Sequence, residues 1–304
     1  MEKNNKVRKQ YRLRKKTLLA CILTAGLVFV IGRACFRAKE DGADVQEGLA
    51  GAGISFGLSK KAGGSQDDEA ARVRQEMIDR ADRLAAAYDY DGAAALLRGA
   101  DGYETDSVMQ EKASSYEAVK ETCVPVNMEE VTHVFYHSLV VDPNRAFAGQ
   151  DTDPQAAGNN QWMTTVSEFE KITQEMYDRG YVIVGIHDLI NETTDENGNT
   201  VYAPAQIMLP PGKRAYVLSQ DDLCYYHCYD NYGFASRMIL DENGKPVCEY
   251  IQEDGTHVSG AYDVVPLLDA FIEEHPDASY RGAKGIIALT GYNGILGYRT
   301  DNSY

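Results

Sequence analysis

The chain has 304 residues, of which 44% are hydrophobic and 25% are charged, and this composition excludes a wholly disordered protein. Its length suffices for one large domain and an accessory segment. The formal net charge is −16, which argues against a nucleic-acid partner because binding to a phosphate backbone needs clustered Lys and Arg.

Positive charge is concentrated at the amino terminus. Residues 1–16 hold eight Lys or Arg and one Glu, a net charge of +7, so the rest of the chain carries −23. The run "TLLACILTAGLVFVIG" follows at residues 17–32 without a charge. As a helix it spans roughly 24 Å, somewhat less than the hydrocarbon core of about 30 Å.

This segment has two interpretations, a cleaved signal peptide and an uncleaved signal anchor. We favour the anchor because "GRACFRAKED" after the apolar run lacks a small-x-small cleavage site. The prediction is a single-pass protein of the cell membrane. Residues 1–16 are cytoplasmic, residues 17–36 cross the membrane, and the acidic main domain lies on the extracytoplasmic side.

Two further segments precede the main domain. Residues 37–66 are rich in Gly, Ala and Ser and predict a flexible linker. Residues 67–123 have helical periodicity, with three short helices expected. Their "YDYDGAAALL" turn resembles one tetratricopeptide-type unit, but a single unit cannot bury its own face, so an ordinary helical spacer is the better interpretation.

Residues 124–304 alternate between strand and helix patterns. Strands are expected in "VTHVFYHSLV" (131–140), "YVIVGI" (181–186), "AYVLS" (215–219) and "GIIALTG" (285–291), the last three buried. An amphipathic helix is expected after Thr165, which forms a capping box with Glu168, and it stops at Gly180. A second helix is expected in "YDVVPLLDAFIEEHP" (262–276). This order predicts an α/β fold with parallel strands, either a barrel or a doubly wound sheet.

Two adjacent aspartates end the third of these strands. Asp221 and Asp222 follow "AYVLSQ", and reactive groups in parallel α/β folds collect at the carboxyl ends of strands. One carboxylate can bind a divalent cation while its neighbour takes a proton from water. The plainer interpretation is a turn or a helix cap, where Asp is common.

The segment "LSQDDL" resembles the first motif of the polysaccharide deacetylase (NodB-homology, carbohydrate esterase) family, Thr/Ser-Phe-Asp-Asp-Gly. "HVFYHSL" (133–139) is similar to that family's opening strand, and residues 162–189 to its next helix and strand. The resemblance covers residues 128–304 and implies a partial (β/α) barrel. It also implies that Asp221 is the catalytic base, that Asp222 is a ligand of a divalent metal, Zn²⁺ by analogy, and that the substrate is an acetylated cell-surface polysaccharide.

The chain departs from the family motif at several points. Gln220 stands in place of Phe and Leu223 in place of Gly, and no pair of histidines with the family's spacing follows Asp222. We therefore expect an apparently truncated domain over residues 124–304. Two functions remain open: a metal-dependent deacetylase, and a catalytically inactive glycan-binding or envelope scaffold protein on the same fold.

Three other residues are candidate substrate contacts. His137 follows the first strand, Tyr225 lies in the aromatic loop after the aspartates, and Arg299 corresponds loosely to an arginine that steers the base in the family. His137 is alternatively a buried histidine bonded to backbone. The loop tyrosines either stack on sugar rings or pack over the barrel mouth. The run "CYYHC" (224–228) offers two thiols and an imidazole, but a zinc site needs four ligands, so this one cluster does not indicate zinc. The four cysteines beyond the membrane segment do not specify a disulfide pairing.

Overall fold

The computed structural model describes residues 66–300, which belong to one compact unit, Gly64–Tyr304. The predicted cytoplasmic segment, the predicted anchor at residues 17–36 and nearly all of the predicted linker lie outside the described residues. Among residues 66–300, no helix is both long enough and apolar enough to cross a membrane.

Three helices open the described part of the chain, as their periodicity predicts: α2 (Gln66–Ala86), α3 (Tyr90–Arg98) and α4 (Ser107–Thr122). Aspartates cap two of them. The Asp89 side chain accepts a hydrogen bond from Gly92 N, and the Asp106 side chain accepts from Val108 N and Met109 N. Three fully buried alanines, Ala81, Ala93 and Ala113, allow the three helices to pack closely, and the Leu97 side chain is fully buried beside them.

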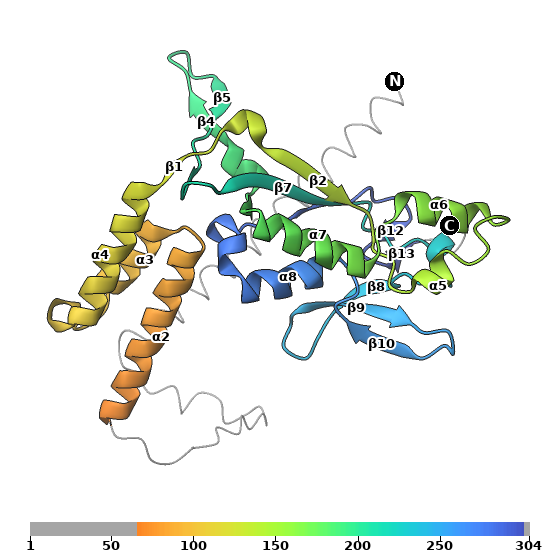
Figure 1. Ribbon diagram of the computed structural model, residues 1–304, viewed down its shortest axis with the longest axis horizontal. Coiled ribbons are helices and arrows are strands. Elements are labelled where there is room, and N and C mark those ends of the chain that lie inside the picture. The colour runs from red at the N-terminus through yellow and green to blue at the C-terminus, as the bar shows by residue number, and fades with distance from the viewer. Residues whose placement is uncertain (1–65, 301–304) are drawn as a thin grey trace, which may run out of the picture. The chain divides into compact units, whose positions relative to one another are not determined.

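A four-stranded parallel sheet forms the centre of the α/β region: β2 (Thr132–Tyr136), β3 (Tyr181–Ile183), β7 (Arg214–Asp221) and β11 (Ile286–Ala288). Figure 1 labels two of these strands, β2 and β7, which run side by side. The other three strands of this sheet all pair with β7. β2 lies along one of its edges. On the opposite edge, β3 pairs with residues 214–216 and β11 with residues 219–221.

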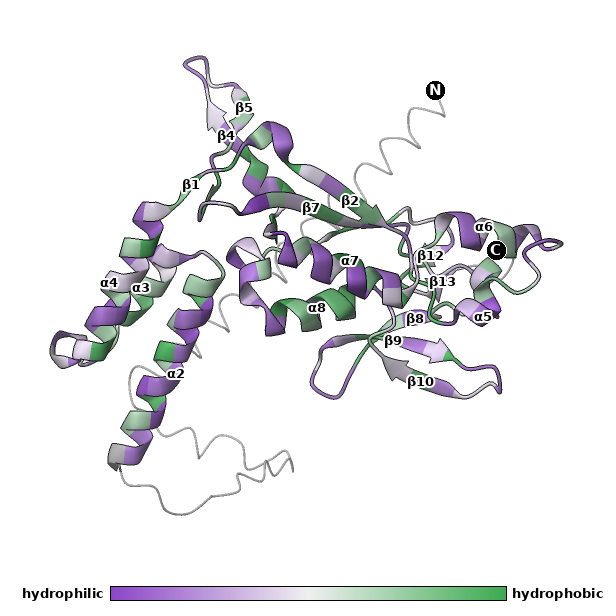
Figure 2. Cartoon of the chain, in the orientation of Figure 1, coloured by the Kyte–Doolittle hydropathy of each residue, from purple (hydrophilic) through white to green (hydrophobic). Residues whose placement is uncertain are grey.

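Two helices cover one face of this sheet, α7 (Val166–Asp178) and α8 (Val264–Glu274). Figure 1 shows both on the same side of β2 and β7, and Figure 2 shows α8 as hydrophobic along most of its length. The predicted capping box of Thr165 and Glu168 is confirmed at the start of α7. The side chains that form this core are Tyr136, Leu139, Phe169, Ile183, Tyr216, Leu218, Val264 and Leu268.

The other face is covered over only part of its length. Towards the amino ends of the strands, Val182, Ala215 and Val217 share a core with the three helices and with β6 (Met208–Leu209), which pairs with β1 (Val124–Pro125). Towards the carboxyl ends this cover stops, and the ring of Phe135 on β2 is 59% exposed. The open half of this face therefore leads directly to the strand ends.

β11 corrects one prediction. The apolar run at residues 285–291 predicts a buried strand, but Ile287 is 41% and Leu289 is 46% exposed. β11 is an edge strand, since it pairs with β7 on one side and has no strand on its other side among the described residues. An apolar sequence signals burial on both faces, whereas this strand is covered incompletely.

The remaining strands form three small antiparallel units: the hairpin β4 (Ile190–Thr194) and β5 (Thr200–Pro204), the meander β8 (Arg237–Leu240), β9 (Pro246–Ile251) and β10 (His257–Gly260), and the pair β12 (Gly294–Ile295) and β13 (Tyr298–Arg299). Two short helices follow β2, α5 (Pro143–Ala146) and α6 (Pro154–Trp162). Six 3₁₀ turns complete the described chain: Tyr103–Thr105, Met128–Glu130, Ile186–Leu189, His227–Tyr229, Pro276–Ala278 and Tyr280–Gly282. Residues 66–300 contain no closed barrel, and the partial barrel stays a prediction.

Candidate functional site

Polar side chains from three neighbouring strands meet at the carboxyl edge of the central sheet. His137 directly follows β2, Asp221 ends β7, and Thr290 follows β11 by two residues. Parallel strands bring their carboxyl ends to one edge, so residues far apart in the sequence converge there. We treat this edge as the candidate site.

His137 and Asp221 form an accessible imidazole–carboxylate pair. The distance from His137 Nε2 to Asp221 Oδ2 is 3.9 Å, which is an electrostatic contact and too long for a hydrogen bond. Their side chains are 38% and 47% exposed. The Phe135 ring lies edge-on to the imidazole, with the ring centroids 6.1 Å apart. Both groups are thus open to a substrate approaching the strand ends.

Asp222 points elsewhere and is held firmly. Its φ of 54° lies in the left-handed region, which is unusual for a residue with a side chain and turns the chain sharply after β7. Its Oδ1 accepts hydrogen bonds from the Tyr226 hydroxyl at 2.6 Å and from Thr290 Oγ1 at 2.7 Å. Burial, and then the nearby Asp222, raise the pKa of Tyr226, so its hydroxyl remains a donor at neutral pH.

Tyr225 does not reach the surface of the site. The residue is only 2% exposed, and its hydroxyl donates to Asp263 Oδ2 at 2.7 Å and lies 3.4 Å from Cys248 Sγ. The structure therefore gives Tyr225 a place in the core, and the proposed direct contact with substrate is not available to it in this conformation.

Arg299 also acts on the loop and not on Asp221. Its Nε donates to the Tyr225 carbonyl at 2.6 Å, and its terminal nitrogens donate to the two carboxylate oxygens of Asp230 at 2.9 and 3.1 Å. The Arg299 side chain is 13% exposed. A bidentate arginine–carboxylate pair of this kind fixes the path of residues 225–230.

Sequence reasoning missed two residues of the site, Thr290 and Tyr292. Tyr292 is 59% exposed, and its ring centroid lies 6.3 Å from that of Tyr226, next to Asp222. The signal was available in "IIALTGY", where a hydroxyl and an aromatic residue follow a strand end. Tyr229 adds a further ring, 6.4 Å from Tyr226.

The residues at the edge supply only part of a metal site. Among the described residues, no group of three His, Cys, Asp or Glu side chains is placed to hold a metal ion. Cys224, Cys228 and Cys248 are free thiols, as is Cys123. Cys224 is buried, and its Sγ lies 3.3 Å from Thr290 Oγ1. Asp222 and the His137–Asp221 pair are the available donors, so the predicted zinc site is incomplete within residues 66–300.

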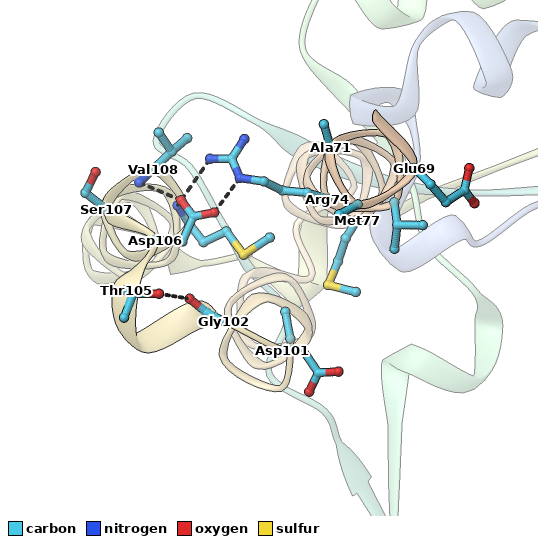
Figure 3. A pocket seen from close by; sticks show the side chains of 14 residues that line it. Glu69, Ala71, Arg74, Met77, Asp101, Gly102, Thr105, Asp106, Ser107 and Val108 are labelled. Atoms are coloured by element: carbon cyan, nitrogen blue, oxygen red, sulfur yellow. Dashed lines mark hydrogen bonds and ion pairs between the residues drawn. The ribbon is translucent and has the colours of Figure 1, made fainter. Parts of the chain in front are cut away.

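A hollow of about 920 Å³ lies between α2 and the segment that joins α3 to α4 (Figure 3). Its walls include Val73, Met77 and Val108, and the ion pair of Arg74 with Asp106 crosses it. Within residues 66–300, no histidine or cysteine lines this hollow. The strand ends are the stronger candidate site because the titratable and aromatic side chains converge there.

Comparisons with known proteins add nothing to this assignment, since no family model, curated protein or solved structure matches the chain.

Proposed function

We propose that this protein is a hydrolase of the polysaccharide deacetylase type, which removes acetyl groups from a cell-surface glycan. The observation that carries the proposal is the meeting of His137 and Asp221, from neighbouring parallel strands, at an open sheet edge where Asp222 is held by two hydroxyls. The resemblance of "LSQDDL" to the family's aspartate motif supports the same assignment.

In the proposed reaction, Asp221 accepts a proton from water while the water oxygen attacks the acetyl carbonyl. The bond from the carbonyl carbon to the sugar nitrogen or oxygen then breaks. The proton passes to that leaving atom, and acetate and a free amine or hydroxyl are released. His137 contacts the substrate beside the base, and the exposed ring of Tyr292 offers a surface on which a sugar can stack.

The metal that the family resemblance implies is only partly matched by these residues. Asp222 has one carboxylate oxygen engaged by Tyr226 and Thr290, and no third His, Cys, Asp or Glu among the described residues completes a set with it. No step of the proposed reaction is therefore assigned to a metal.

The test is acetate release from acetylated oligosaccharides, N-acetylated and O-acetylated in separate assays, with and without a chelator. Asp221→Asn should lower the rate at least 100-fold, because amides do not act as general bases. Asp254→Asn is the matched control. Asp254 lies in the turn between β9 and β10, and its carboxylate accepts a hydrogen bond from Thr256 N. Equal rates for Asp221→Asn and the wild type would exclude the proposed mechanism.

The cluster of tyrosine rings beside Asp222 favours a second function, that of an envelope protein which binds glycan without hydrolysing it. Tyr226, Tyr229 and Tyr292 lie with ring centroids 6.3 to 6.4 Å apart in successive pairs. If no acetate is released but the protein binds the same oligosaccharides, and Tyr292→Ala abolishes that binding, this second function holds.

A further inference from the structure

Asp263 is a fully buried carboxylate, with 0% of the residue exposed, at the start of α8. Asp263 is the N-cap residue of α8, and its Oδ1 accepts a hydrogen bond from Val264 N at 2.8 Å. The same oxygen accepts from Leu139 N at 3.1 Å, and Oδ2 accepts from the Tyr225 hydroxyl at 2.7 Å. One side chain thus joins three segments of the chain.

Two of these segments carry the candidate site. Leu139 is two residues after His137, and Tyr225 is three residues after Asp222. Capping alone does not require this arrangement, because a cap needs only one oxygen directed at the first turn of its helix. The two additional hydrogen bonds, from Leu139 N and from the Tyr225 hydroxyl, therefore link the segment after β2 to the loop after β7.

The loop after β7 needs such a restraint. Tyr225 has a φ of 53° and Asp222 a φ of 54°, both in the left-handed region, and such conformations persist only where the surroundings fix them. Arg299 holds the Tyr225 carbonyl, and Asp263 holds the Tyr225 hydroxyl, so both ends of this residue are fixed.

Burying the ionised carboxylate of Asp263 costs free energy. Burial raises the pKa of Asp263 to about 6, although hydrogen bonds from Tyr225, Val264 N and Leu139 N, and the nearby Gln220 of β7, all act to lower it. Cys248 of β9 also faces this group through Tyr225. A serine would cap α8 without burying an ionisable group.

We propose that Asp263 is a positioning residue, which sets the distance between His137 and the Asp221–Asp222 pair through Leu139 and Tyr225. The inference rests on the proposed function for its catalytic consequence. The mechanical part, the coupling of the two segments, is independent of any activity.

Hydrogen–deuterium exchange tests the coupling in the full chain. Asp263→Ser keeps a cap oxygen for α8 and is too short to reach Leu139 and Tyr225 together. We expect amide exchange in residues 138–141 and in residues 222–226 to quicken at least tenfold, together. Asp106→Ser is the matched control, because Asp106 caps α4 with bonds from Val108 N and Met109 N, and it should leave both segments unchanged.

Tyr225→Phe keeps the capping carboxylate and removes only the hydroxyl, which bonds to Asp263 and also contacts Cys248 Sγ, so it provides the test if Asp263→Ser does not fold. It should quicken exchange in residues 222–226 more than in residues 138–141. Unchanged exchange in both segments of a folded variant would overturn the proposal.

Acetate release gives the catalytic readout. A positioning role predicts that Tyr225→Phe lowers kcat about tenfold with KM within twofold, because the reacting groups are misplaced while the binding surface remains. A KM effect without a kcat effect would contradict the positioning role. A wild type that releases no acetate would refute the proposed function and leave the exchange result to decide the coupling.

Discussion

The buried carboxyl of Asp263 should make the stability of this protein depend on pH in an unusual direction. Most acidic residues have a lower pKa in the folded state, and they stabilise it as pH rises. The folded-state pKa of Asp263 is about 6, against 3.8 for the free side chain. Its contribution to stability is therefore fully present below pH 3.8 and is lost as pH rises through 6.

The size of this effect follows from the two pKa values. A difference of roughly two units corresponds to about 3 kcal/mol in the free energy of unfolding, since each unit is worth about 1.4 kcal/mol. About 2 kcal/mol of this should be lost between pH 4.5 and pH 7, because the folded form titrates inside that window. Other groups titrate too, so the effect must be isolated by comparison with a variant that cannot ionise.

Urea unfolding of the wild type and of Asp263→Asn at pH 4.5, 5.5 and 7.0 makes this comparison. The stability of the wild type relative to the variant should fall by about 2 kcal/mol across the series, whatever the fixed cost of the substitution. Asp106→Asn is the control: Arg74 lowers the pKa of Asp106 to about 2, so its difference from wild type should stay flat over this window. A flat difference for Asp263→Asn, or one of opposite sign, would refute the reasoning.

Three further substitutions probe other parts of the described chain, each measured by urea unfolding at pH 7. Phe169→Ala should lower the free energy of unfolding by about 3–5 kcal/mol, because the ring is 1% exposed and packs edge-on against Tyr136; a loss below about 1 kcal/mol would contradict this packing. Gly297→Ala should cost at least about 2 kcal/mol, since φ is 84° and the new Cβ would lie 2.4 Å from the Ser236 carbonyl oxygen; a neutral result would mean that the turn relaxes freely. Tyr88→Phe should cost about 1 kcal/mol, because it removes a 2.6 Å hydrogen bond to the Asp277 carbonyl, and an unchanged stability would show that this bond contributes nothing.

Local sequence patterns predicted the local structure well. The capping box at Thr165, the stop at Gly180 and three helices before residue 123 are all signals read within a few neighbouring residues, and the structure confirms them. The β11 strand forms as its sequence predicts, but the prediction that it is buried is wrong, because burial depends on which other elements cover a strand. Hydrophobic composition alone carries no information about that cover.

The candidate site was predictable only in part, and the reason is distance along the chain. Asp221 and Asp222 were found because they follow a strand end. The bond from Leu139 N to Asp263 joins residues 124 positions apart, and the bond from Thr290 to Asp222 joins residues 68 apart. Asp263 also resembles an ordinary helix cap, so its buried network has no local signature. The expected surface role of Tyr225 failed for the same reason, since only tertiary packing shows that its hydroxyl turns inwards.

The incomplete cover over one face of the sheet explains why two aspartates, Asp221 and Asp222, can stand side by side at the end of β7. Residues 215–218 of β7 are all at most 5% exposed, and polarity begins at Ser219, where the cover over the second face stops. Asp221 continues that face and meets His137 in the open, whereas the left-handed turn at Asp222 directs the next carboxylate to Tyr226 and Thr290. The two carboxylates therefore have separate partners among the described residues. Metal dependence has to be decided by the chelator arm of the acetate assay.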